Sequence, residues 1–216
     1  MESRPGDKRA YSSEMRAEQA RHTRARIVGT ARELLLAHGY FAMTVPLLAR
    51  RAGVSPQTVY NSVGGKADVV KAVYDVLLAG DDDPVPMSER PEFRSVVDAP
   101  DVGEYARAYA AWTRGIWERV GPLLGVILAH GPGGDDVLEA FLSTIDEERR
   151  VGNSHSLEGL SDRGALPAGR TIDELVASVW TLTAPEAYDR LVRRSGWPPS
   201  RYETWLAAQL AAALAD

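Results

Sequence analysis

The spacing of apolar residues constrains this chain most, because it follows a helical period through most of its length. One early stripe consists of Ile27, Ala31, Leu34, Leu35 and His38, and a later one of Tyr105, Tyr109, Trp112 and Ile116. Apolar residues three and four apart lie on one face of a helix, whereas a strand needs alternation. We find no period-two pattern with hairpin turns and no internal repeat. The sequence therefore predicts an all-α fold.

Glycine and proline divide the chain into separate helices. The first begins between Ser13 and Thr23 and ends at His38, with Gly39 at its left-handed end. The other predicted helices are 44–52, 56–62, 66–79, 101–119, 122–130, 135–160, 171–182, 186–194 and 199–214. Residues 80–100 hold four prolines and are predicted to form a linker or an irregular lid.

Charge is distributed unevenly along the chain, although the whole carries a net charge of −5. Residues 1–75 hold 12 Lys and Arg against 7 Asp and Glu, whereas residues 76–216 hold 13 against 23. A basic start and an acidic remainder favour two tasks in one chain, one of them with an anionic partner. The absence of cysteine and of an apolar leader favours a cytoplasmic location.

Residues 44–66 have the pattern of a helix, a turn and a second short helix. Thr44 suits the N-cap of the first helix, Gly53 suits the turn, and Ser55 with Pro56 suits the start of the second. The side chains expected to project outward are Pro56, Gln57, Thr58, Tyr60 and Asn61. Short polar helices of this kind enter the DNA major groove, where Gln and Asn can bond bases and Tyr can bond a phosphate. Pure packing is the alternative.

The stretch "TVPLLARRAGVSPQTVYNSVGGKADVV", preceded by "AHGYFAMT", resembles the DNA-binding signature of TetR-family transcriptional regulators over about residues 23–78. The positions that match are Thr44, Ala49, Ala52, Gly53, Val54, Ser55, Thr58, Tyr60 and Lys66. The family often has His-Phe where this chain has Ser62 and Val63, so a phosphate contact from that histidine is missing.

The resemblance implies three segments: a flexible basic arm (1–20), a helix-turn-helix DNA-binding domain (21–66), and a linking helix with an effector-binding and dimerisation domain (67–216). It also implies a homodimeric repressor that leaves a palindromic double-stranded operator when it binds a small-molecule effector. The DNA-binding residues would be Thr44, Ser55, Pro56, Gln57, Thr58, Tyr60, Asn61 and Lys66. The arm and first helix add Arg16, Arg21, Arg24 and Arg26, which can meet the DNA backbone.

Two further sets of residues are predicted in the acidic part. The effector-pocket set is Tyr109, Trp112, Ile116, Trp117, Leu128, Phe141 and His155. The dimer-interface set is Val176, Val179, Trp180, Trp205, Leu206, Gln209 and Leu210. Such stripes also occur in ordinary cores, so each set can instead pack within one chain.

Other classes of protein find little support in the sequence. There is no phosphate-binding loop, nucleophile elbow or metal-ligand spacing, so we expect no catalytic residues, no cofactor and no metal. The longest apolar run near the end is shorter than the roughly 20 residues that a membrane span needs, so no membrane partner is expected. A non-specific architectural DNA-binding protein remains the main alternative, and a helical enzyme is a more remote one.

Overall fold

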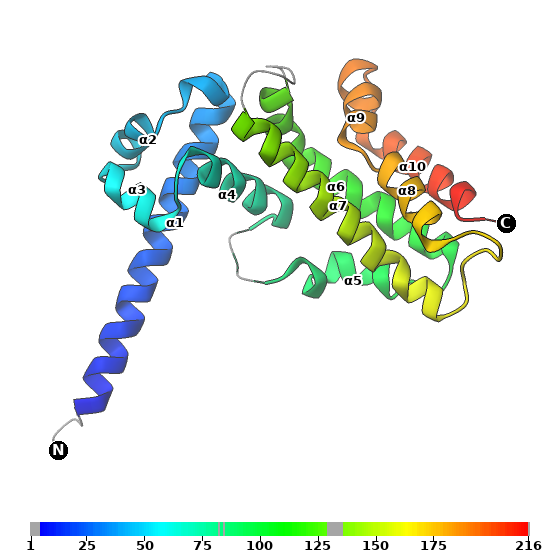
Figure 1. Cartoon of the computed structure of the whole chain (residues 1–216), viewed down its shortest axis with the longest axis horizontal. Coiled ribbons are helices and arrows are strands. Elements are labelled where there is room, and N and C mark those ends of the chain that lie inside the picture. The colour runs from blue at the N-terminus through cyan, green and yellow to red at the C-terminus, as the bar shows by residue number, and fades with distance from the viewer. Residues whose placement is uncertain (1–4, 82, 84, 129–135, 216) are drawn as a thin grey trace. The chain divides into compact units, whose positions relative to one another are not determined.

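The computed structural model describes residues 5–81, 83, 85–128 and 136–215, and all regular structure among them is helical. Side chains are described from Glu14 onward, with that of Leu128 excepted. The predicted all-α fold is therefore confirmed. Two compact units can be distinguished, Met1–Val76 with Leu123–Gly134 and Leu77–Pro122 with Asp135–Asp216 (Figure 1). The boundary between the units follows Val76 and so falls within the helix Lys66–Ala79. The sequence instead predicts a domain boundary after residue 66, at the start of that helix.

The first unit is built on four helices, α1 (Pro5–Ala42), α2 (Val45–Ala52), α3 (Pro56–Ser62) and the greater part of α4 (Lys66–Ala79). Helix α1 packs against α2 and α3, which also contact each other. Their shared core contains Ile27, Ala31, Leu35, Met43, Leu48, Val59, Val69 and Val73. His38, which the helical stripe predicted to be buried, is exposed. The core holds α3 by its apolar side and leaves the other side free.

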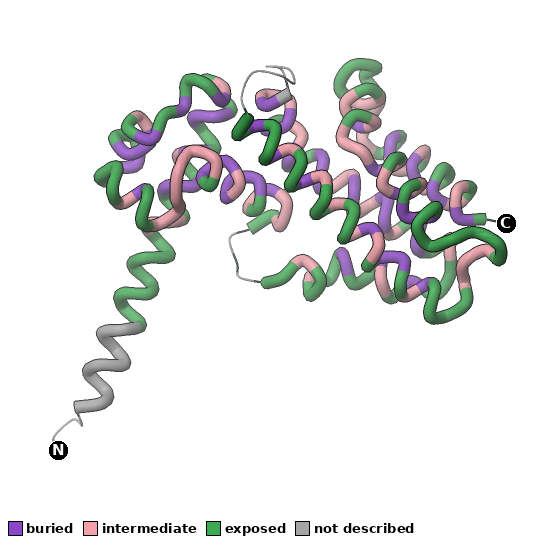
Figure 2. Tube along the Cα trace, viewed as in Figure 1, coloured by how far each residue is buried: buried purple, intermediate pink, exposed green. Residues whose placement is uncertain are grey.

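Helix α1 starts earlier than predicted, since residues 5–20 are helical and not an irregular arm. No proline or glycine interrupts residues 7–28, and Pro5 falls in the first turn, where its missing N–H costs nothing. Residues 14–22 are exposed (Figure 2). The helix is interrupted at Gly39, where the sequence predicts its end; φ is 82°, a value that favours glycine, but ψ is 171°, so the residue does not adopt the predicted left-handed helical conformation.

The second unit contains the remaining elements. They are η1 (Met87–Glu89), α5 (Pro91–Val97), α6 (Val102–Leu128), α7 (Asp136–Asp162), α8 (Ile172–Leu182), α9 (Pro185–Tyr188), the π-helical η2 (Asp189–Arg194) and α10 (Pro199–Ala213). Helix α7 packs against α5 and α8, and α8 packs against α10. The last residues of α6, from Leu123, belong to the first unit.

Two predictions about this region are wrong in detail. The stretch 80–100 is not wholly irregular, because Pro91 begins α5 and the helix buries Phe93 and Val96. Helix α6 continues through Pro122, where the sequence predicts a break. An internal proline costs about 3 kcal/mol, but Val120 and Leu123 on either side are completely buried, and burial of this size can offset the cost.

No helix among the described residues is both long enough and apolar enough to cross a membrane.

Candidate nucleic-acid interface and ligand pocket

Three local features fix the angle between α2 and α3. Thr44 caps α2, its Oγ1 accepting a hydrogen bond from the Leu47 N–H at 3.3 Å. Gly53 ends α2 in the left-handed conformation with φ 65° and ψ 38°, which favours glycine. Ser55 then caps α3, its Oγ accepting from the Thr58 N–H at 3.0 Å, and Pro56 occupies the first turn. The predicted helix-turn-helix is therefore formed by the residues that the sequence indicates.

The middle and the C-terminus of α3 are anchored to the shared core and to α1. Val59 has no exposed surface. At the C-terminus, Arg24 of α1 donates from Nη1 to the carbonyl oxygen of Ser62 at 3.1 Å. The sequence allows Arg24 either a contact with the DNA backbone or a solvated surface position, and the structure gives it a contact with the recognition helix. Its spacing from Ile27 and Ala31 places it on the buried face of α1, and that spacing is the signal that the sequence-based reasoning missed.

The outward face of α3 carries the predicted polar residues. Gln57 and Asn61 are both exposed and one turn apart, and Gln57 Nε2 donates to Asn61 Oδ1 at 2.9 Å. Tyr60 is 52% exposed beside them. Thr58 is half-buried because its hydroxyl lies 2.8 Å from that of Ser55. The structure thus brings Gln57, Tyr60 and Asn61 together on one free surface.

Lys66 lies apart from this face, at the first residue of α4. Its ammonium sits 3.9 Å from the centroid of the Tyr40 ring and 5.7 Å from that of Phe41. This cation–π geometry joins the end of α1 to the start of α4. Lys66 is half-buried, so it contributes to packing in addition to any contact with DNA.

Most residues of the predicted effector set lie in the core of the second unit. Tyr109, Ile116, Trp117 and Phe141 are buried. His155 is exposed, with Nδ1 3.8 Å from Glu158 Oε2. The side chain of Leu128 lies outside the described residues. For the buried members, packing within one chain is the arrangement that the structure shows.

Two tyrosines of that core make polar contacts from α6 to α7. The Tyr105 hydroxyl lies 2.8 Å from Ser156 Oγ, and the Tyr109 hydroxyl donates to Asn153 Oδ1. Burial raises the pKa of both tyrosines above the ordinary value. Asn153 is 3% exposed, and its Nδ2 has no hydrogen-bond partner in the described structure. Both tyrosines therefore act as neutral hydrogen-bonding groups.

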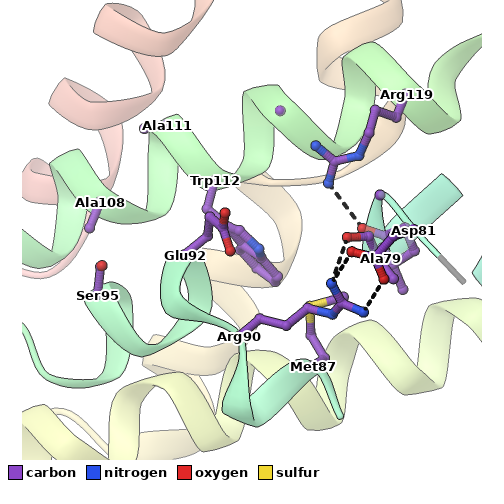
Figure 3. Close-up of a pocket in the computed structure, with 13 residues that line it drawn as sticks. Ala79, Asp81, Met87, Arg90, Glu92, Ser95, Ala108, Ala111, Trp112 and Arg119 are labelled. Atoms are coloured by element: carbon purple, nitrogen blue, oxygen red, sulfur yellow. Dashed lines mark hydrogen bonds and ion pairs between the residues drawn. The ribbon is translucent and has the colours of Figure 1, made fainter. Parts of the chain in front are cut away.

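A cavity of about 550 Å³ is present in the second unit, beside Trp112 (Figure 3). It is lined by Leu78, Ala79, Gly80, Asp81, Met87, Arg90, Glu92, Ser95, Ala108, Ala111, Trp112, Gly115 and Arg119. Trp112 is the sole member of the predicted set among them. The others were missed because they come from the end of α4, from the 80–100 segment and from a face of α6 that carries small residues.

Two arginines hold one end of this cavity together. Arg90 donates from Nη1 and Nη2 to the two carboxylate oxygens of Asp81, at 2.7 and 2.8 Å. This bidentate pair lowers the pKa of Asp81 to about 2, chiefly through the hydrogen bonds from Arg90. Arg119 donates to the carbonyl oxygens of Leu77 and Leu78 at 2.9 and 3.0 Å. Positive groups thus meet the negative end of the α4 dipole.

The predicted dimer residues separate into two groups. Val176, Val179, Leu206 and Leu210 are buried within the single chain, where α8 packs against α10. Trp180 and Trp205 are half-buried and Gln209 is exposed. The first group forms the intrachain core, which was the alternative left open by the sequence, and the second group retains accessible surface.

Among the described residues, no three His, Asp or Glu side chains gather as metal ligands would.

Comparison with known proteins agrees with this geometry. Residues 27–73 match the model for bacterial regulatory proteins of the tetR family. No curated protein matches the chain.

Several solved structures share the fold at low sequence identity. A protein described as a TetR-family transcriptional regulator from Syntrophomonas wolfei gives a TM-score of 0.69 at 13% identity, covering 90% of this chain and 96% of the other. The SmeT–triclosan complex gives 0.66 at 16% identity, covering 90% and 93%. MexZ, described as a repressor in Pseudomonas aeruginosa, gives a TM-score of 0.61 at 20% identity, covering 90% of this chain and 96% of the other.

These matches concern the same segment as the turn, the caps and the exposed face of α3. Residues 27–73 of this chain are therefore a tetR-family regulatory domain, within a chain that has the all-α fold of TetR-family transcriptional regulators.

Proposed function

We propose that this protein is a sequence-specific DNA-binding transcriptional regulator that inserts α3 into the major groove. The observation that carries the proposal is the free polar face of Gln57, Tyr60 and Asn61, on a helix held by caps and by the Val59 core contact. Binding a groove requires that such a face stay unoccupied and rigid, because both conditions lower the entropy cost of association.

The residues of α3 have different tasks in this proposal. Gln57, in the first turn, reads a base edge, and its amide can bond adenine in a bidentate manner. Asn61 orients Gln57 through their hydrogen bond and reaches the next base or the sugar-phosphate backbone. Tyr60 bonds a phosphate through its hydroxyl. Thr44, Ser55 and Thr58 fix the geometry by capping and keep hydroxyls near the backbone, and Lys66 adds positive charge.

We also propose a homodimer formed through α8 and α10. A palindromic operator needs two recognition helices about 34–36 Å apart. The interior faces of α8 and α10 are already used, so the interface falls on the exposed faces, which carry Ala177 and Thr181 on α8 and Ala208, Gln209 and Ala212 on α10. Small side chains there allow two copies of the helices to approach closely. Sedimentation of Ala208→Arg as a monomer, with wild type as a dimer, supports this face.

Finally, we propose that the protein is a repressor and that a small-molecule effector releases it from DNA. Two observations support it: the cavity in the second unit, and fold neighbours that are named a repressor in one case and a complex with triclosan in the other. A ligand can lower operator affinity only if it binds the two states of the protein differently.

The test is a selection of genomic DNA fragments by the purified protein at near-physiological salt, followed by titration of the enriched site. We expect a palindrome with two major-groove half-sites. Gln57→Ala should weaken binding by about 10- to 100-fold, the value of a good base contact, and relax the preference at one position of each half-site. Tyr60→Phe should weaken binding to every sequence alike.

The opposite result is equally informative. Binding that depends steeply on salt but does not distinguish the selected site from random duplex identifies an architectural DNA-binding protein and overturns the proposal.

A further inference from the structure

One wall of the cavity in the second unit is a single face of α6. Ala108, Ala111, Trp112, Gly115 and Arg119 recur at helical spacing and all line the cavity. Three of the five are alanine or glycine, so they leave the space beside the indole ring open. Trp112 is held edge-on to Tyr109 and tilted against Phe93, with ring centroids 5.3 and 5.0 Å away. The wall is therefore apolar around Trp112, where neighbouring aromatic rings hold the indole in place, and it carries a charge at Arg119.

The side chains that close the cavity suit an organic ligand of modest size. Leu78 and Met87 add apolar surface, and Met87 is flexible enough to adapt to an occupant. A volume of about 550 Å³ lies within the usual range for small-molecule sites. A flat hydrocarbon body resting against Trp112 would fill the space between α6 and η1.

The polar end of the cavity holds the guanidinium groups of Arg90 and Arg119 and the carboxylate of Asp81, which pairs with Arg90. Asp81 occupies Nη1 and Nη2 of Arg90, whereas the buried Nε of Arg90 has no partner in the described structure. Arg119 bonds only carbonyl oxygens, through Nε and Nη2, and no described carboxylate forms an ion pair with it. A Cβ built on Gly115 would lie 3.5 Å from Arg119 Nη1, so that nitrogen faces the open side of the α6 wall.

We propose that this cavity binds a small aromatic carboxylate, with its ring against Trp112 and its carboxylate on Arg119 Nη1. The inference rests on the proposed function in that it names the class of effector. Glu92 also lines the cavity, but it lies in the first turn of α5, where the helix dipole stabilises its charge. Arg119 is exposed, so its Nη1 is open to solvent and to a ligand, and an anion is the acceptor that a guanidinium binds best.

The position of the ligand also suggests how it acts. The guanidinium that receives the carboxylate is the one that binds the last carbonyl groups of α4. Ligand binding and the position of the α4 end therefore depend on the same group, which gives the ligand the differential contact that a population shift requires.

The first experiment uses the full-length protein without DNA and three probes of one shape. They are 1-naphthoate, 1-naphthalenemethanol and 1-naphthylmethylammonium, which differ in charge. Titration calorimetry should show saturable binding of naphthoate, at least tenfold tighter than binding of the alcohol or the cation. Failure of naphthoate to bind at millimolar concentration overturns the proposal, as does equal or stronger binding of the cation.

The second experiment locates the bound probe. Gly115→Leu fills the cavity beside Arg119, where its Cβ would make an ordinary van der Waals contact with Arg119 Nη1 at 3.5 Å, and it replaces a helical glycine, so the protein should remain folded. It should abolish naphthoate binding. Gly152→Leu makes the same change in α7, where a Cβ meets nothing within 4 Å, and should bind naphthoate as wild type does. Unchanged binding by Gly115→Leu would place the ligand elsewhere and refute the assignment.

Arg119→Gln tests the carboxylate contact. It should weaken naphthoate about tenfold while leaving the alcohol within twofold, because only the anion uses the charge. Equal losses for both probes would contradict the contact.

Since these measurements contain no DNA, they can fail while the operator selection succeeds. A protein that binds naphthoate but selects no operator would support the ligand site and contradict the proposed function.

Discussion

The two units differ in how far their polar side chains reach along the chain. In the helix-turn-helix several of them bond within one turn of chain, as Ser55 does with Thr58 and Gln57 with Asn61. In the second unit, beside local pairs, several join elements far apart in sequence, as Arg114 does with Glu203 at 2.5 Å. A local bond needs only the right residue three or four positions away, whereas a distant bond needs the whole fold. The first kind specifies a shape that can be transferred between proteins, and the second specifies one protein's interior.

The sharpest test of this contrast is the buried pair that joins α6 to α7. Tyr109→Phe removes the donor to Asn153 Oδ1, and the amide is then left without partners in a buried position. We expect the free energy of unfolding in urea to fall by about 1–3 kcal/mol.

Replacing both partners should cost less. Tyr109→Phe with Asn153→Leu leaves no buried polar group unsatisfied, so the double variant should recover much of the loss. A double variant as unstable as the sum of the single ones would mean that shape, and not hydrogen bonding, dominates at this position.

The local geometry can be tested at Gly53. Its φ of 65° strains a β-branched residue, although a Cβ there meets nothing within 4 Å. Gly53→Val should lower stability by about 1–2 kcal/mol and weaken operator binding further, because it also misplaces α3. Gly53→Asn tolerates the same conformation and should stay close to wild type in urea unfolding. Equal behaviour of the two variants would show that this turn does not depend on its backbone conformation.

Arg24 tests a long-range bond in the recognition unit. Arg24→Gln should weaken operator binding by about fivefold, from the loss of about 1 kcal/mol of charge-assisted capping at Ser62. The dependence of affinity on salt should not change, because no phosphate contact is lost. A salt slope reduced by about one unit would instead identify Arg24 as a phosphate contact. Arg32→Gln, at an exposed arginine of the same helix that has no assigned DNA contact, serves as the matched control in the same titration.

The smallest effect is expected from pH. Arg90 lowers the pKa of Asp81 to about 2, so the folded state favours the ionised carboxylate. That contribution is complete above the unfolded pKa, about 3.9, and is lost as pH falls through about 4 to 2. Unfolding of wild type and Asp81→Asn across this range should therefore converge at low pH. The difference should be small and should shrink in high salt, since Asp81 is exposed.

The same contrast explains which features could be predicted from sequence. The caps at Thr44 and Ser55, the turn at Gly53 and the limits of α4 follow from neighbouring residues, and the structure agrees with each. Val179 of α8 and Leu210 of α10 are buried where these two helices pack together within one chain. The sequence could not distinguish this packing from a dimer interface, because an apolar stripe does not show which surface covers it.

The cavity was beyond sequence reasoning for a related reason. Its polar end depends on Asp81 and Arg90, nine positions apart across a segment without regular spacing, and on Arg119 from another helix. Its α6 wall consists mostly of small residues, whereas a search for apolar stripes in the sequence detects large side chains. The aromatic stripe on α6 therefore indicated the core beside the cavity and missed the cavity itself.

The capped end of α4 has a mechanical consequence. The last turn of a helix ordinarily frays, because its final carbonyl groups have only water to bond. Here Arg119 bonds those of Leu77 and Leu78, and Arg90 bonds that of Ala79 at 3.2 Å, so the last turn resists unwinding. A 14-residue helix is about 21 Å long, and one that does not fray at its end behaves as a stiff rod over that length. A small tilt of the helix axis at Ala79 would then displace Lys66, because little of the tilt is lost to bending or unwinding of the helix.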